Sequence, residues 1–148
     1  MDDDAAMGIA LEEALLALSH GDVPVGALAM RNGEIIARAH NERELLRDPT
    51  AHAEVLVVRR AAEALGTWRL DGVTVFVTLE PCTMCAGALL SARVERVVWG
   101  TDDPKAGAAG SLYNVFADPR LNHNPELTVR VRAEECSELL TNFFTAKR

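Results

Sequence analysis

Two short clusters of potential metal ligands, 30 residues apart, constrain this chain more than any other feature of its sequence. The first is His52-Ala53-Glu54 and the second is Pro81-Cys82-Thr83-Met84-Cys85. A structural zinc site is usually closed by four protein ligands, whereas a catalytic site keeps three and leaves the fourth position to water or substrate. One histidine and two cysteines fit the second pattern. The fold must then bring the two segments together around one ion.

Glu54 belongs to the first cluster, but it is not needed as a metal ligand. Residues two apart in a helix point about 200° away from each other, because one turn takes about 3.6 residues. If His52 and Glu54 lie on one helix, the ion must lie off the N-terminal end of that helix. From there His52 could hold the ion while Glu54 acts as general base toward a water molecule. A helix N-terminus at each cluster would also favour the thiolate forms of Cys82 and Cys85.

Each cluster alone has more ordinary interpretations. A Cys-x-x-Cys pair can be a redox pair or half of a structural zinc knuckle, and His-x-Glu occurs often by chance. Together the clusters match the signature His-x-Glu followed by Pro-Cys-x-x-Cys, in which zinc activates water for attack on a nucleobase and the glutamate transfers protons. The combination favours catalytic Zn²⁺, and two thiolates with one imidazole suit zinc better than other common metals.

The composition is that of an ordinary globular protein. Of the 148 residues, 49% are hydrophobic and 25% are charged, which indicates neither disorder nor a membrane class. We expect one domain spanning residues 1–148. No apolar run approaches the roughly 20 residues of a transmembrane helix, and the acidic N-terminus lacks the basic start of a signal peptide. A cytoplasmic protein without a membrane segment is therefore expected.

The charge balance is unusual for a protein that binds nucleic acid. The formal net charge is −7, whereas such proteins usually present a basic surface. The first 13 residues hold five of the 22 acidic residues, however, and the rest of the chain has 17 acidic against 15 basic residues. We interpret Asp2, Asp3 and Asp4 as the start of a helix, where negative charge is favourable. The acidity therefore does not exclude a nucleic-acid substrate.

The hydrophobic pattern alternates between helices and strands. Residues 27–30 and 34–39 are predicted to form a hairpin closed by Arg31-Asn32-Gly33, because Asn-Gly is a strong tight-turn signal. Residues 73–79, 94–100 and 127–132 are predicted to be three further strands. The first helix is expected to bury a stripe formed by Met7, Leu11, Ala14, Leu15 and Leu18.

Both ligand clusters are predicted to open helices. Asp48, Pro49 and Thr50 are expected to start the helix of the first cluster. Its buried stripe is expected to consist of Val55, Val58, Ala62 and Leu65. Five strands and about five helices follow, which supports an α/β fold.

Further segments extend the pattern well beyond the metal ligands. They are Asp22-Val23-Pro24-Val25-Gly26-Ala27, Asn41, Asp48-Pro49-Thr50-Ala51, Thr78-Leu79-Glu80, Ala86-Gly87-Ala88 and Gly107-Ala108-Ala109-Gly110-Ser111-Leu112. With the two clusters, these segments make the chain resemble the bacterial tRNA-specific adenosine deaminases of the cytidine-deaminase-like superfamily. The resemblance covers most of the chain.

The resemblance implies a fold, a reaction and partners. The fold is a three-layer α/β/α sandwich with a mixed five-stranded sheet. The reaction is zinc-dependent hydrolytic deamination of adenosine to inosine at the wobble position of a tRNA anticodon, with one Zn²⁺ per subunit. The partners are the anticodon stem-loop and a second subunit in a homodimer. The resemblance also places Asn41 at the target nucleotide, and Val23 and Asp103 around its base and ribose.

Two other functions stay open at this stage. The nearer one is deamination of a free nucleobase or nucleoside such as guanine, cytosine or cytidine, which would use the same four site residues with different pocket contacts. The second is a noncatalytic zinc-stabilised binding module, which would have no need of Glu54. Taken without the resemblance, Val23 would be assigned to core packing and Asp103 to a turn.

Overall fold

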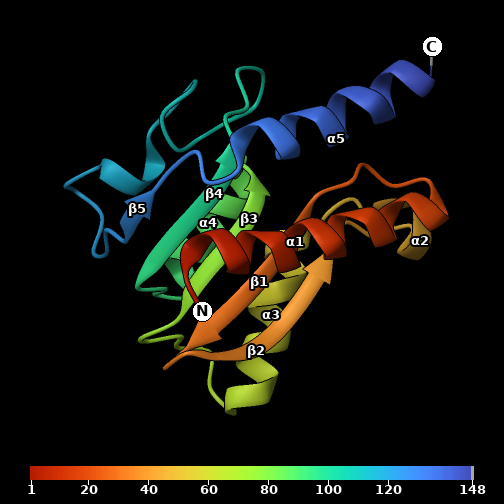
Figure 1. Ribbon diagram of the computed structural model, residues 1–148. Helices are drawn as coiled ribbons and strands as arrows, with labels where there is room; N and C mark the ends of the chain where they lie inside the picture. Colours follow the sequence, from red (N-terminus) through yellow and green to blue (C-terminus); the bar gives the residue numbers. More distant parts are fainter. Residues whose placement is uncertain (148) are drawn as a thin grey trace.

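The computed structural model describes residues 1–147, and within them it contains five strands and five α-helices (Figure 1). The strands are β1 (Gly26–Arg31), β2 (Glu34–His40), β3 (Thr74–Leu79), β4 (Arg96–Thr101) and β5 (Glu126–Thr128). The helices are α1 (Asp3–Ala17), α2 (Arg43–Leu46), α3 (Ala53–Leu65), α4 (Thr83–Ser91) and α5 (Ala133–Ala146), with 3-10 turns at Leu18–His20 (η1) and Val115–Ala117 (η2). In the described part of the chain, no helix combines the length and the apolar character that crossing a membrane requires.

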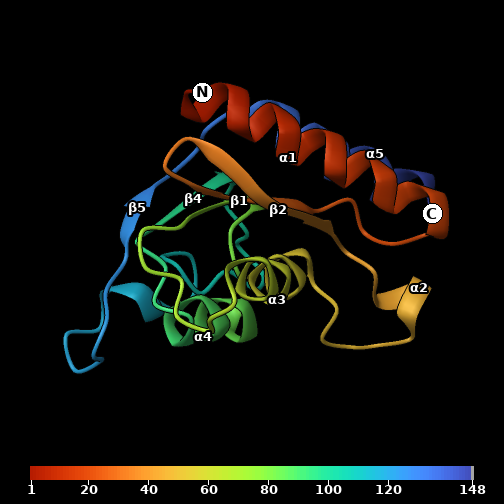
Figure 2. The ribbon, with the colours of Figure 1, turned by 90° about the horizontal axis from the view of Figure 1, so that it is seen from below.

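The strands form one mixed sheet in the order β2-β1-β3-β4-β5. Strand β1 is antiparallel to β2 and β3, whereas β3, β4 and β5 run parallel. Helices α1 and α5 cover one face of the sheet, and α3 and α4 cover the other (Figure 2). This arrangement confirms the predicted three-layer α/β/α sandwich.

Alternate residues of the central strands supply the two halves of the core. Val75 and Val77 of β3 pack on the side of α3 and α4. Phe76, between them, packs with Met7 and Ala10 of α1 on the other side. Successive side chains of a strand point to opposite faces, so a strand covered on both faces is apolar throughout.

The predicted hairpin is present. Asn32 and Gly33 connect β1 to β2, and their φ angles of 53° and 77° are both left-handed, as the favoured two-residue hairpin turn requires. The last strand is shorter than predicted and ends at Thr128. Arg130 and Arg132 have left-handed φ angles of 59° and 54°, which are incompatible with a strand through 132.

Helix α1 faces the sheet with small residues, and here the predicted stripe was partly wrong. Leu15 and Leu18 are exposed, whereas the buried positions are Ala6, Met7, Ala10, Ala14 and Ala17. The cause is the close approach of α1 to β1, in which a Cβ added to Gly26 would overlap the backbone of Ala10 and Ala14. Large side chains cannot fit between elements at that distance.

The buried face of α3 is also rotated from the prediction. Its buried residues are Ala53, Glu54, Leu56, Val57 and Ala61. All four predicted positions are only partly buried, and Val58, Ala62 and Leu65 pack at the margin of the core. The burial of Glu54 shows why apolar periodicity alone misplaced this face.

Replacing Gly26 by alanine should test the close packing of α1 on β1. The added methyl group would push the helix away from the sheet, and overpacking of this kind costs typically 1–3 kcal/mol, or more when backbone must move. Thermal or denaturant unfolding of Gly26→Ala should show a loss of at least about 2 kcal/mol in the free energy of unfolding. Unchanged stability would contradict this account of the α1–β1 contact.

Candidate active site

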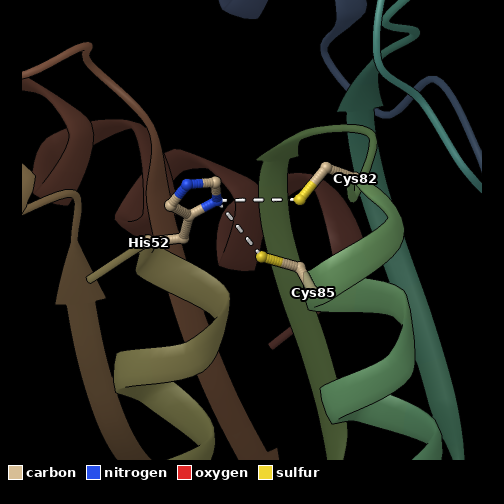
Figure 3. A group of neighbouring side chains, drawn as sticks. All are labelled: His52, Cys82 and Cys85. Atoms are coloured by element: carbon tan, nitrogen blue, oxygen red, sulfur yellow. Dashed lines mark hydrogen bonds between the residues drawn. The ribbon is translucent and has the colours of Figure 1, made fainter. Parts of the chain in front are cut away.

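The two predicted ligand clusters meet where α3 and α4 begin (Figure 3). His52 directly precedes α3, and Cys82 directly precedes α4, whose first turn contains Cys85. The Nδ1 atom of His52 lies 3.7 Å from Sγ of Cys82 and 3.4 Å from Sγ of Cys85. The three candidate ligand atoms lie within 4.8 Å of one another.

These distances fit a metal ion. A nitrogen ligand at about 2.05 Å and a sulfur ligand at about 2.3 Å, bound tetrahedrally to one zinc ion, would lie about 3.5 Å apart. Both measured separations are within a few tenths of an ångström of that value. The group formed by His52, Cys82 and Cys85 could therefore hold a metal without rearrangement.

The two thiols differ in their ionisation. The Cys85 thiol donates a hydrogen bond to Cys82, and this bond is the largest cause that lowers the pKa of Cys82 to about 3. The same bond, together with burial, raises the pKa of Cys85. Hydrogen bonding to Cys82 is also the largest cause of the raised pKa of His52. The backbone N–H of Cys85, in the first turn of α4, adds a smaller lowering of the pKa of Cys82, which is the contribution expected from a helix end.

Glu54 lies beside this group in the first turn of α3. Its side chain is almost fully buried, and its carboxylate contacts the Cys85 thiol. Burial raises the pKa of Glu54 to about 7, because the charged form loses its hydration. A carboxyl group with this pKa can both accept and return protons at neutral pH.

Asn41 fixes the start of α3. Its Oδ1 accepts a hydrogen bond of 2.8 Å from the backbone N–H of Ala53, and its Nδ2 donates to the carbonyl oxygen of Val23 at 3.1 Å. The prediction that Asp48 and Thr50 start this helix was wrong. Asp48 instead accepts from the backbone N–H and the hydroxyl of Thr50, which closes a separate turn.

One cleft of about 920 Å³ contains six of the seven residues predicted for the site. Val23, Asn41 and His52 line one side of it, and Asp103 lies in the loop that follows β4. Glu54 and Cys82 also line the cleft, while Cys85 is fully buried beneath them. The Asp103 carboxylate accepts from the backbone N–H groups of Lys105 and Ala106, so it shapes the loop as well as facing the cleft.

Comparison with known proteins assigns the chain to a family. A family model for MafB19-like deaminases matches residues 1–148. The tRNA-specific adenosine deaminase of Bacillus subtilis (strain 168) is 51% identical over 146 residues, which cover 99% of this chain and 91% of that protein. The chain belongs to the tRNA-specific adenosine deaminase family.

Solved structures agree with this assignment. A structure from work on A-to-I editing by tRNA:A34 deaminases at the wobble position has a TM-score of 0.89 and 44% identity, covering 92% of this chain and 99% of that one. A guanine deaminase from Nitrosomonas europaea has a TM-score of 0.85 but only 23% identity, over 97% and 85% of the two chains. The second likeness shows the shared fold alone.

The deaminase also has cleft residues to which the sequence analysis assigned no role. Arg43 in α2, Glu80 after β3 and Leu140 and Phe144 in α5 all line the cleft. Glu80 had one local signal, since a glutamate directly after an apolar buried strand is unusual. Arg43 had none, because an arginine in a polar segment is ordinarily a surface residue.

Metal uptake by the deaminase should release protons. The raised pKa of Cys85 keeps its thiol protonated at neutral pH, whereas a metal binds the thiolate, so binding must displace that proton. We expect zinc affinity to fall as the pH is lowered from 8 to 6. Calorimetric titration of the chelator-treated protein in buffers of different ionisation enthalpy would measure the protons released. A pH-independent affinity with no proton release would contradict the assignment of Cys85 as a ligand.

Proposed function

We propose that this deaminase converts adenosine to inosine at the wobble position of a tRNA anticodon, using one zinc ion per subunit. The observation that carries the proposal is the convergence of His52, Cys82 and Cys85 beside the buried Glu54 in a chain of this family. Three ligands leave a fourth position for water, which is the pattern of a catalytic zinc site. The catalytic unit would be a single domain of residues 1–148.

The chemistry then divides between the ion and the chain. Bound zinc supplies a Lewis acid that lowers the pKa of a water molecule from about 15.7 toward 7. Glu54 takes a proton from the attacking water as its oxygen bonds to C6 of adenine. It returns that proton to the ring nitrogen, and it then carries the second proton of the water from the new C6 hydroxyl to the amino group as the C6–N bond breaks. The products are inosine and ammonia, and the raised pKa of Glu54 suits both directions of transfer.

The substrate pocket would lie along the cleft away from the ligands. Asn41 and Val23 would contact the target nucleotide on the side of α3, and Asp103 would lie near its base or ribose. Arg43, Lys105 and Lys147 also line the cleft and supply positive charge. These three side chains would pair with phosphates of an RNA backbone, and the carboxylates of Glu54, Glu80, Asp102 and Asp103 also line the cleft.

Deamination of a free nucleobase or nucleoside is the alternative that shares the same four site residues. The family of this chain argues against it. The relative at 51% identity is a tRNA-specific adenosine deaminase, whereas the 23% likeness to a guanine deaminase shows the fold alone. The cleft is also lined by Leu140, Phe144 and Lys147 of the C-terminal segment. A noncatalytic zinc module is disfavoured by the burial of Glu54, which a structural site does not need.

Ammonia release tests the reaction and the role of Glu54 together. Zinc-loaded protein should deaminate an anticodon stem-loop with adenosine at the wobble position, and it should not act on free adenosine, cytidine or guanine. Glu54→Gln keeps the shape of the side chain and should retain zinc while losing 10²–10⁴-fold in turnover, as is typical when a general acid–base is removed. Glu54→Ala should behave in the same way.

Two results would overturn these assignments. Normal turnover by Glu54→Gln would remove Glu54 from the mechanism. Activity on a free base with none on the stem-loop would keep the chemistry and change the substrate.

We also propose a homodimer, formed through the side of the molecule that carries α4. Large apolar side chains are exposed there, namely Trp68 at 64%, Met84 at 37%, Leu112 at 52%, Tyr113 at 62% and Leu121 at 42%. Trp68 and Leu121 line one shallow hollow with Leu90 and Val115. Aromatic and methionine side chains are enriched at protein interfaces, so this face is suited to a second copy.

A cytoplasmic location stays a prediction.

Sedimentation equilibrium should give twice the 16.0 kDa chain mass at micromolar concentration. Trp68→Glu would place a charge in the apolar face and should shift the protein to monomer without loss of folded structure. A wild-type monomer at these concentrations, or a variant that dimerises as well as wild type, would contradict the proposed interface.

A further inference from the structure

Glu80 is a buried carboxylate that the proposed chemistry does not use. It follows the last residue of β3, and only 2% of its surface is exposed. Its Oε1 accepts from the backbone N–H of Asp103 at 2.9 Å and from the hydroxyl of Ser111. Its Oε2 accepts from the backbone N–H groups of Ala109 and Ser111 at 3.1 and 3.0 Å.

The four donors all belong to the loop between β4 and η2. This loop has no helix or strand of its own between residues 102 and 114, so few of its backbone groups are paired in regular structure. Buried backbone N–H groups need acceptors, and a buried carboxylate needs donors. Glu80 satisfies both needs at once, and it ties the two ends of the segment 103–111 to one point.

The same loop connects the cleft wall to the ligand segment. Residues 101–106 line the same cleft as Asn41. Farther along, the backbone N–H of Ala108 donates to the carbonyl oxygen of Pro81 at 2.8 Å, and Gly107 pairs with Cys82. A Cβ added to Gly107 would overlap the Glu80 carboxylate, so the close packing here requires glycine. The loop that forms this wall of the cleft is therefore attached to Pro81 and Cys82, and Cys82 is a predicted metal ligand.

We propose that Glu80 is a positioning residue that holds the 103–111 loop in the conformation able to receive the RNA substrate. It acts through the loop and has no part in proton transfer. The proposal rests on the proposed function, because that function places the target nucleotide against Asp103. Its specific consequence is that removing hydrogen bonds between Glu80 and the loop should weaken substrate binding more than it slows the chemical step.

Glu80→Gln is the sharpest change. An amide nitrogen cannot accept a hydrogen bond, so the variant must deprive either Asp103 or the pair Ala109 and Ser111 of their acceptor. When only a fraction of molecules has the competent loop, apparent affinity falls by that fraction. With zinc-loaded protein and the anticodon stem-loop, KM should rise about tenfold while kcat stays within about threefold of wild type. Zinc content should be unchanged.

Asp118→Asn is the matched control. Asp118 also accepts from a backbone N–H, that of Arg120 at 3.0 Å, but it lies outside the cleft. This variant should retain wild-type KM and kcat. Ser111→Ala removes a single hydrogen-bond donor from Glu80 and should raise KM about threefold. It replaces Glu80→Gln as the test if that variant does not fold. The effects of Glu80→Gln and Ser111→Ala should not add, because both act on one cluster.

Amide hydrogen exchange in the same samples separates this proposal from the proposed function. Exchange at Asp103, Ala109 and Ser111 should be faster in Glu80→Gln than in Asp118→Asn whether or not the RNA is a substrate. If the zinc-loaded wild-type protein is inactive on the anticodon stem-loop, the proposed function is wrong. The positioning role is overturned if these amides keep wild-type exchange, if Glu80→Gln matches the control in KM, or if zinc is lost and kcat falls at constant KM.

Discussion

The three candidate ligand atoms must face one point, and the backbone meets this requirement by starting α3 directly after His52 and α4 directly after Cys82. A residue just before a helix has an extended backbone, so its side chain projects past the end of the helix rather than along its flank. Two helices on the same face of the sheet can then aim three side chains at one position. The mixed sheet supports this arrangement, because β3 leads directly into the second cluster.

Burying two carboxylates near the site is unfavourable, and each is compensated by its own surroundings. Glu54 and Glu80 are buried carboxylates, each of which would be unfavourable without compensation. Glu80 is compensated by four donors from one loop. Glu54 has no such set, and its pKa rises instead. Two identical side chains thus take opposite roles, one holding structure as a hydrogen-bond acceptor and the other able to exchange a proton.

The sequence predicted those parts of the structure that depend on residues close together in the chain. The turn at Asn32-Gly33 was predictable because few residues tolerate a left-handed backbone. The ligand set was predictable from the spacing of His52, Cys82 and Cys85, since few chemistries use that pattern. The resemblance added Asn41, Val23 and Asp103, which line the cleft, although their roles toward substrate stay predictions.

What the sequence could not predict depends on partners far along the chain. Hydrophobicity ranks leucine above alanine, so the alanine face of α1 was not apparent until its close approach to Gly26 was known. The donors of Glu80 lie 23 to 31 residues away from it. The cap of α3 was sought next to the helix, whereas Asn41 supplies it from the end of the hairpin, 12 residues away.

The double attachment of Asn41 limits how such a pocket can be altered. One amide group joins the Val23 segment to the first turn of α3, so the wall of the pocket and the histidine beside that turn share a single support. A replacement at this position would disturb both together. New substrate preferences would therefore arise more readily from side chains such as Val23, which can change shape while the backbone bond from its carbonyl oxygen remains. The part of the cleft beside the candidate metal ligands is then its least adaptable region, and the side lined by α5 is freer to diverge.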